Sequence, residues 1–172
     1  VCGSAPLVDA IREYQRITGA VVDPHTSYLL IRGLKTMALR VERQNESAQA
    51  IAEFLERHHK IKKVWYPGLP SHPDHAIAAA QMRGYGGLIS FEIDGGLDRT
   101  KDFVHQLELP YIAPSLGGVE TLVSHPATVS YYDLSREERL AIGISDELVR
   151  YAVGVEEAEE LIDDIERALA GV

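Results

Sequence analysis

The sequence has almost no cysteine: Cys2 is the only one among 172 residues, so no disulfide bond can form within the chain. So few cysteines are typical of a reducing compartment, and we expect a cytoplasmic protein. Basic residues are also scarce, since 17 Lys and Arg face 26 Asp and Glu and give a formal net charge of −9. This charge disfavours nucleic acids and anionic membranes as partners. No apolar run approaches the roughly 20 residues that a membrane span requires.

The beginning of the chain lacks two further features. It starts at Val1 rather than at methionine, and its first residues do not form the charged and then apolar segments of a secretory signal. We interpret the sequence as a fragment, a processed chain or a shortened form of a longer protein. Its composition, with 45% apolar and 25% charged residues, is that of a globular domain with a core.

Two helices are predicted in the first third of the chain. The first covers Ser4 to Thr18, because a serine stands at its start and Gly19 follows its end. The second covers about Ser27 to His58, where an apolar stripe at spacings of four and three contains one polar residue, Gln44. This stripe fits a coiled-coil seam. We favour a long helix that links two parts of a larger enzyme, because Gly33 lies in it and no second heptad segment follows.

Strands and helices alternate through the rest of the chain. Strands are predicted at Ile61–Tyr66, Leu88–Ile93, Tyr111–Ala113, Val119–Val123 and Leu148–Val153. Helices are predicted at about Asp74–Met82, Leu97–Leu107, from Ser135 onward, where a capping box begins, and at Glu156–Ala170. This order predicts an α/β domain, an α+β sandwich in which helices cover one face of a single sheet.

Two stretches carry the clearest chemical signal. One is the glycine-bearing turn Pro114–Leu122, which contains Ser115, and the other is the apolar run Leu148–Gly154, which contains Arg150. Glycines let a backbone approach a ligand closely, and a guanidinium offers the paired donors that a carboxylate accepts. The Ser115 hydroxyl and the Arg150 guanidinium could therefore hold a carboxylate between them. Each residue alone would more often be a turn residue or a surface ion pair.

Other candidate residues carry little signal. His72 and His75 are three residues apart, but a closed zinc site needs four ligands and no cysteine is near them, so we predict no metal site. Cys2 is interpreted as a small hydrophobic residue, since no paired base can be named for it.

Several motifs together resemble one enzyme family. They are Ile17–Ala20, Arg32–Thr36 with Arg40–Arg43, Tyr66–Pro73, Ser115–Leu122, His125–Thr128, Gly143–Ile144, Leu148–Arg150 and Gly154–Glu156. In this order they resemble the carboxyl-terminal half of the pyridoxal-phosphate enzymes of cysteine and methionine metabolism. The family includes cystathionine γ-synthases and γ-lyases, methionine γ-lyases and O-acetylhomoserine sulfhydrylases. The resemblance covers essentially the whole chain.

The resemblance implies a fold, an assembly and a set of site residues. The fold would be that of a fold-type I transferase, usually a homotetramer, with residues 1–28 as the tail of the large cofactor domain. Residues 29–172 would be the carboxyl-terminal substrate-binding domain with its long leading helix. In the family, the matching positions place the substrate α-carboxylate on Arg150 with help from Ser115, and Thr121 matches a hydroxyl near the same pocket.

The sequence also departs from the family pattern. The lysine that binds pyridoxal 5'-phosphate lies, in the family, in a Ser-x-x-Lys segment that has no counterpart here, and the phosphate-binding turn and the ring-stacking tyrosine are missing too. We therefore expect no catalytic and no cofactor-binding residue in this chain. Activity would require an amino-terminal half as partner, and the chain alone would be inactive.

Position 114 bears on the subtype. Family members that act on cystathionine often carry an acidic residue directly before the serine, where it can bind the distal amino group, and this chain has Pro114. The stretches Ile112–Ser115 and Ser130–Ser135 are most similar to the plant-like cystathionine γ-synthases. The expected reaction is γ-replacement on an activated homoserine. The alternatives are a γ-lyase, a sulfhydrylase, or a non-catalytic interaction module that retains the fold.

Overall fold

The computed structural model describes residues 2–172 and divides into two compact units, Val1–Ala38 and Leu39–Val172. The first unit contains α1 (Ala5–Thr18) and α2 (Pro24–Leu34), and neither helix buries a residue. Gly19 ends α1 in the left-handed region with φ of 69°, as its place after the predicted helix indicated. The predicted boundary after residue 28 falls inside α2, and the assignment of its two sides to different domains stays a prediction.

The predicted single helix from Ser27 to His58 is wrong. The chain forms α2 and then α3 (Met37–Arg57), with a turn at Lys35 and Thr36 between them. The start of α2 is also earlier than predicted, because the Asp23 carboxylate accepts hydrogen bonds from the backbone N–H groups of His25 and Thr26. The apolar spacing of four and three continues across the turn, so the pattern alone could not reveal the interruption.

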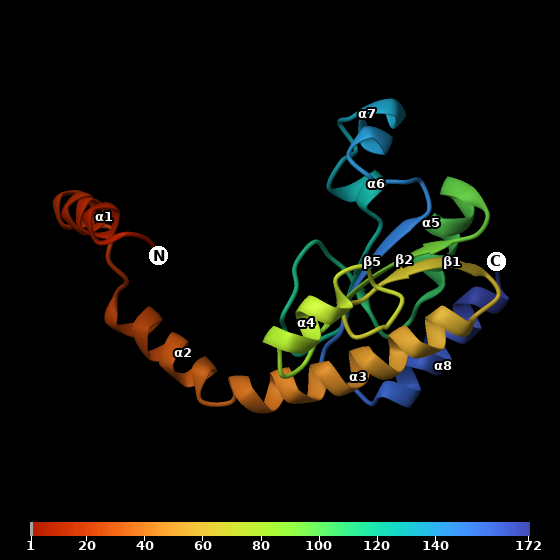
Figure 1. Ribbon diagram of the computed structural model, residues 1–172, viewed down its shortest axis with the longest axis horizontal. Coiled ribbons are helices and arrows are strands. Elements are labelled where there is room, and N and C mark those ends of the chain that lie inside the picture. Colours follow the sequence, from red (N-terminus) through yellow and green to blue (C-terminus); the bar gives the residue numbers. More distant parts are fainter. Residues whose placement is uncertain (1) are drawn as a thin grey trace. The chain divides into compact units, whose positions relative to one another are not determined.

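The second unit is built on one five-stranded sheet with the strand order β1-β2-β5-β4-β3 (Figure 1). The strands are β1 (Ile61–Trp65), β2 (Leu88–Ile93), β3 (Tyr111–Ile112), β4 (Leu122–Ser124) and β5 (Leu148–Ala152). All neighbouring pairs are antiparallel except β3 and β4, which are parallel. The strand that carries Arg150, β5, therefore lies in the middle of the sheet.

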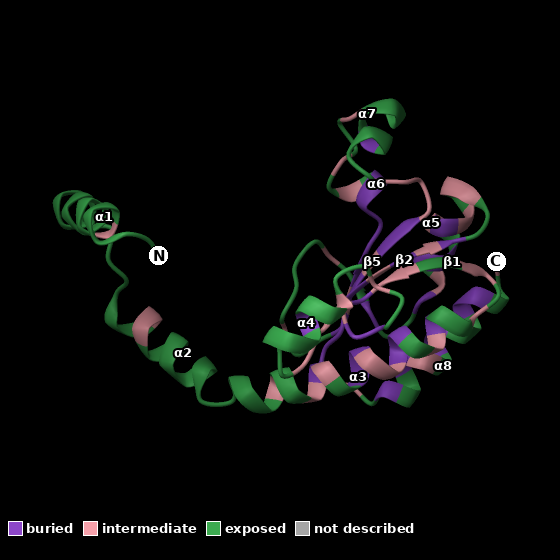
Figure 2. Cartoon of the chain, viewed as in Figure 1, coloured by how far each residue is buried: buried purple, intermediate pink, exposed green. Residues whose placement is uncertain are grey.

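Alternation along the strands creates one apolar face. In β2, Ile89, Phe91 and Ile93 are fully buried, while the residues between them are partly exposed. Val149 and Tyr151 of β5 belong to the same core cluster. Figure 2 shows most of β5 and the inner sides of α3 and α8 as buried, and the outer sides of these helices and much of the edge strand β1 as exposed or intermediate.

Three helices supply the other half of this core. They are α3, α5 (Gly96–Gln106) and α8 (Ala158–Ala170), and their buried residues include Ile51, Leu55, Phe103, Leu161 and Ile165. The Phe91 and Phe103 rings meet edge to face with centroids 6.0 Å apart. The predicted α/β class, with helices on one face of a single sheet, is confirmed. Within residues 2–172, every helix is too short or too polar to span a lipid bilayer.

Smaller differences concern the ends of elements. The helix α4 (His75–Gln81) and the strand β2 lie where they were predicted, but β4 begins at Leu122 instead of Val119. The short helix α6 (Pro126–Val129) was not predicted, although proline at a first helical position is a recognised signal. The helix α7 (Arg136–Ala141) has the predicted capping box between Ser135 and Glu138.

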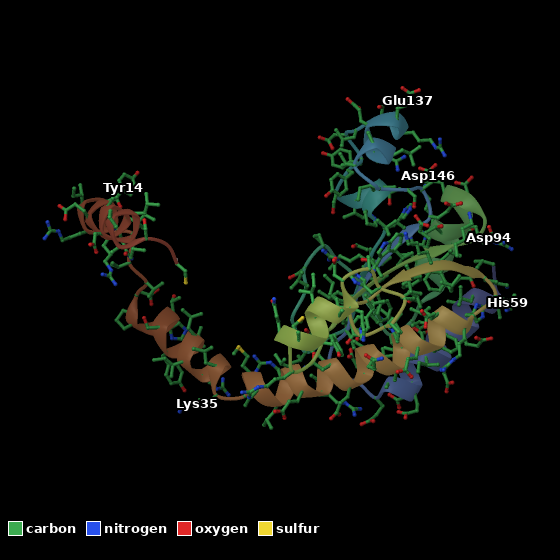
Figure 3. The ribbon with its side chains drawn as sticks, viewed as in Figure 1. Tyr14, Lys35, His59, Asp94, Glu137 and Asp146 are labelled. Atoms are coloured by element: carbon green, nitrogen blue, oxygen red, sulfur yellow. The ribbon has the colours of Figure 1, made fainter. Side chains whose placement is uncertain are left out.

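The segment between β4 and β5 is fastened by one carboxylate. Asp146 accepts hydrogen bonds from Arg136 Nε at 2.6 Å and from Arg139 Nη2 at 2.7 Å. Figure 3 shows Asp146 near the base of this segment and Glu137 near its far end. The hydrogen bond from Arg136, followed by that from Arg139, lowers the pKa of Asp146 below its usual value.

We expect Asp146→Asn to lower the free energy of unfolding at pH 7 by about 1.5–3 kcal/mol, the range for hydrogen bonds to a charged group. Because the folded-state pKa is depressed, this contribution is present above the unfolded-state pKa of about 4 and is lost as the pH falls through the folded-state value. Denaturant unfolding at pH 7 and at pH 3 measures it.

The matched control is Asp133→Asn, an exposed aspartate of the same segment. It should leave the unfolding curve unchanged at both pH values. An Asp146→Asn effect of the same size at both pH values would contradict the ion-pair account.

Candidate functional site

Arg150 lies in the middle of β5, on the sheet face that the helices α3, α5 and α8 do not cover. Its neighbours in the antiparallel register are Ser90 on β2 and Ser124 on β4, so three polar side chains cross the sheet in one row. The residues before and after Arg150 in β5 point to the helical core. The apolar run around the arginine is thus explained by the core, and the arginine itself belongs to the opposite face.

The guanidinium of Arg150 is only partly paired. Its Nη2 donates to the Ser115 carbonyl oxygen at 2.7 Å and to the Ala113 carbonyl oxygen at 3.4 Å. Its Nε is buried and has no hydrogen-bond partner among residues 2–172. A buried donor of a cation without an acceptor is costly, by about 1–3 kcal/mol or more. A carboxylate oxygen is the acceptor that fits such a donor best.

Ser115 contacts Arg150 through its backbone carbonyl oxygen. The expected clamp, in which the serine hydroxyl and the guanidinium hold a carboxylate between them, stays a prediction. Ser115 and Pro114 are both exposed. Gly117, two residues further on, has φ of 77°, which favours glycine and lets the turn fold back. The structure brings the two residues together, and the direction of the turn's backbone decides which atom makes the contact.

Thr121 is fully buried, and its hydroxyl is paired in both directions. It donates to Glu156 Oε2 at 2.7 Å and accepts from the Gly154 N–H at 2.9 Å, while the Thr121 N–H donates to Glu156 Oε1 at 2.7 Å. A Cβ added at Gly154 would lie 2.3 Å from the Val119 carbonyl oxygen, so this crossing needs glycine. The predicted role of Thr121 near a substrate stays a prediction.

Two residues beside the turn were not predicted as part of the site. Glu156 holds Thr121, and Gln44 of α3 donates from Nε2 to the Gly118 carbonyl oxygen at 2.8 Å. The signal for Gln44 was its place as the one polar residue in an apolar stripe. For Glu156 the sequence offered only its place in one of the family motifs.

Four of the five lysines make contacts away from Arg150, and Lys35 is exposed. Lys60 donates to the carbonyl oxygens of Leu169 and Val172 at the end of α8. The others with described contacts pair with carboxylates or an aromatic ring: Lys62 with Glu147 and Asp94, Lys63 with Trp65, and Lys101 with Asp98. None of these surroundings is the desolvated pocket that a lysine acting as an uncharged amine requires. The described residues therefore do not fit covalent attachment of pyridoxal phosphate.

Metal binding has no support in the described part of the chain. No group of three or more His, Cys, Asp or Glu residues within 2–172 is arranged to hold an ion. The buried imidazole of His125, beside Ser124, is paired instead with the Asp146 carbonyl oxygen at 2.9 Å and with the Thr128 hydroxyl at 3.0 Å. Burial lowers the pKa of His125, so the ring is held neutral.

Comparison with known proteins gives consistent results. Cystathionine gamma-synthase 1, chloroplastic, from Arabidopsis thaliana is 51% identical over 100% of this chain and 31% of its own length. A crystal structure of a cystathione gamma lyase from Micromonospora echinospora superposes with a TM-score of 0.91 at 39% identity, over 100% of this chain and 45% of the other. A cystathionine gamma synthase from Xanthomonas oryzae pv. oryzae, solved with aminoacrylate and cysteine, gives 0.90 at 39% identity, over 99% and 44%.

The chain thus spans between about a third and just under a half of the relatives that it matches. Over its own length the agreement is nearly complete, because the model of one family, described as Cys/Met metabolism PLP-dependent enzyme, matches residues 1–170. The chain belongs to the Cys/Met metabolism family of pyridoxal-phosphate-dependent enzymes.

Proposed function

We propose that this chain is the carboxyl-terminal part of a transsulfuration enzyme of the cystathionine γ-synthase type, and that Arg150 binds the α-carboxylate of its amino-acid substrate. The observation that carries the proposal is the buried Nε of Arg150, which has no acceptor among the described residues. The guanidinium is fixed at one nitrogen by two backbone carbonyls, so its plane is set before a ligand arrives.

The site is suited to holding one end of a small anion. A carboxylate bound to Arg150 would lie on the uncovered sheet face, close to the row that Arg150 forms with Ser90 and Ser124. Two oxygens on one planar guanidinium fix the orientation of the attached carbon as well as its position. Holding that carbon in one orientation is the contribution to the rate that this chain can make.

The reacting chemistry is assigned to other residues. Pyridoxal phosphate, when bound, supplies the electron sink for amino-acid chemistry. Lys60, Lys62, Lys63 and Lys101 are engaged in other contacts, so the lysine and the phosphate site would come from the remainder of a longer protein. We accordingly propose that residues 1–172 alone are inactive.

The exposed apolar side chains of the first unit favour the proposal that this chain is part of a longer enzyme. The helices α1 and α2 bury none of their residues, and several of their large apolar side chains are more than half exposed: Leu7, Tyr14, Ile17, Tyr28, Leu30, Ile31 and Leu34. Apolar surface of this extent normally packs against another segment. We propose that the amino-terminal half of the enzyme covers it, within the homotetramer that the resemblance implies.

Two observations favour the synthase over the lyases. The relatives from Arabidopsis thaliana and Nicotiana tabacum, at 51% and 49% identity, are cystathionine gamma-synthases. Pro114, directly before Ser115, offers no charge to the distal ammonium group of cystathionine. The expected substrates are therefore an activated homoserine and cysteine.

Replacing Arg150 tests the carboxylate site. In the complete enzyme, Arg150→Ala should lower kcat/KM for an activated homoserine by about 100-fold or more, since the substrate loses its paired donors. Arg150→Lys should recover only part of this loss, because an ammonium cannot form the two parallel hydrogen bonds. Steady-state kinetics of cystathionine formation measures both.

The control is Arg99→Ala, which removes another guanidinium that donates to a backbone carbonyl, that of Asp94 on the α5 side of the molecule. Its kcat/KM should stay close to that of the wild type. An unchanged kcat/KM in Arg150→Ala would remove Arg150 from the substrate site.

Replacing Pro114 tests the subtype. Pro114→Glu should strengthen inhibition by cystathionine about fivefold or more, because an exposed carboxylate beside Arg150 can pair with the distal ammonium of that molecule. Pro114→Gln is the control of equal size without the charge. If both variants change inhibition equally, the charge at this position does not discriminate between substrates.

A further inference from the structure

The turn that touches Arg150 is held in place by side chains from two other elements. Gly118 accepts from Gln44 of α3, and Thr121 is bound by Glu156, which follows β5. One backbone bond joins the same two segments, from the Val155 N–H to the Val119 carbonyl oxygen at 2.9 Å. The turn is thus fixed at Gly118, Val119 and Thr121. All three follow Ser115, the residue that contacts the arginine.

Gln44 is an unusual residue for its position. It is 7% exposed and lies on the same helical stripe as the core residues Ala48, Ile51 and Leu55. A polar side chain there is costly unless its hydrogen-bonding groups are satisfied, and its Nε2 donates to the turn. A small cavity of about 80 Å³ between Gln44, Leu116 and Gly117 leaves this part of the turn free to move if the bond is lost.

Glu156 restrains the other end of the turn. Both of its carboxylate oxygens accept from Thr121, one from the backbone N–H and one from the hydroxyl. Its own carbonyl oxygen accepts from Arg43, the residue before Gln44, at 3.3 Å. The helix α3 therefore holds the turn directly through Gln44 and also holds the segment that carries Glu156.

We propose that Gln44 and Glu156 are positioning residues for substrate binding. By fixing Gly118 and Thr121 they keep the Ser115 carbonyl against Arg150 Nη2, and so they set the orientation in which Arg150 presents its remaining donors. The inference rests on the proposed carboxylate role of Arg150. It adds that the affinity of the arginine for that carboxylate depends on two side chains that do not touch the arginine.

The first test is Gln44→Met in the complete enzyme. Methionine has a similar size and suits an apolar stripe, so the fold is retained while the donor to Gly118 is lost. The KM for an activated homoserine should rise about tenfold, with kcat changed by less than about twofold, because the loss is in binding. The Val155 amide, which bonds the turn, should also exchange its hydrogen faster with solvent.

The matched control is Gln49→Met on the same helix. Gln49 also donates to the carbonyl oxygen of a glycine, Gly68, but in a loop that does not contact Arg150. It should change neither KM nor the exchange of the Val155 amide. Glu156→Gln, which keeps the shape but can accept only one of the two bonds from Thr121, should reproduce the effect of Gln44→Met.

A double-mutant cycle separates this inference from the proposed function. If Gln44 acts through the arginine, Gln44→Met should raise KM no further in an Arg150→Ala background. Effects that multiply would overturn the inference, as would an unchanged KM in Gln44→Met beside a clear loss in Arg150→Ala. An Arg150→Ala enzyme with unchanged kcat/KM would overturn the proposed function, and the inference with it.

Discussion

A partly unpaired guanidinium in the middle of a central strand is the constraint on which the rest of this structure depends. Strand β5 must bury Val149 and Tyr151 in the helical core, and alternation then places Arg150 on the opposite face. There the charge cannot be left without acceptors, so backbone carbonyls of the turn at Ala113 and Ser115 are brought against Nη2. These carbonyls pair only part of the guanidinium, since Nε has no hydrogen-bond partner within residues 2–172. The same packing that stabilises the domain therefore leaves Arg150 with a donor that a ligand could pair.

The parts of the fold that the sequence predicted are those in which one local pattern decides the outcome. Strand β2 was located residue by residue because Ile89, Phe91 and Ile93 alternate with partly exposed residues, and α7 because its capping box is a local motif. The break at Lys35 was missed because two successive helices can share one apolar spacing. Strand β4 begins late because the Thr121 N–H donates to a side chain, Glu156, that lies 35 residues away. No local pattern contains that partner.

The candidate site likewise has features that the sequence could indicate and features that it could not. Family motifs placed Ser115 beside Arg150, a pairing over 35 residues that spacing and periodicity could not have given. The expectation concerned the serine hydroxyl and did not include its carbonyl oxygen, because the direction of a carbonyl depends on the backbone angles of a turn that contains Gly117. The family motifs also could not show that the Thr121 hydroxyl is already paired on both sides. The sequence could name candidate residues, whereas their hydrogen-bond partners could be identified only in the three-dimensional structure.

The distribution of rigid and adjustable parts suggests how one site can serve several reactions in a family. Arg150 is fixed by a central strand and a packed core, so its guanidinium lies in a constant place relative to the sheet. The turn from Ala113 to Thr121 is exposed over most of its length and depends on a few side-chain bonds from Gln44 and Glu156. A substitution in this turn can therefore change what lies next to the substrate without disturbing the core. Pro114 is one position in this turn where a substitution would alter the surroundings of Arg150. It lies directly before Ser115, whose carbonyl oxygen accepts a hydrogen bond from the arginine.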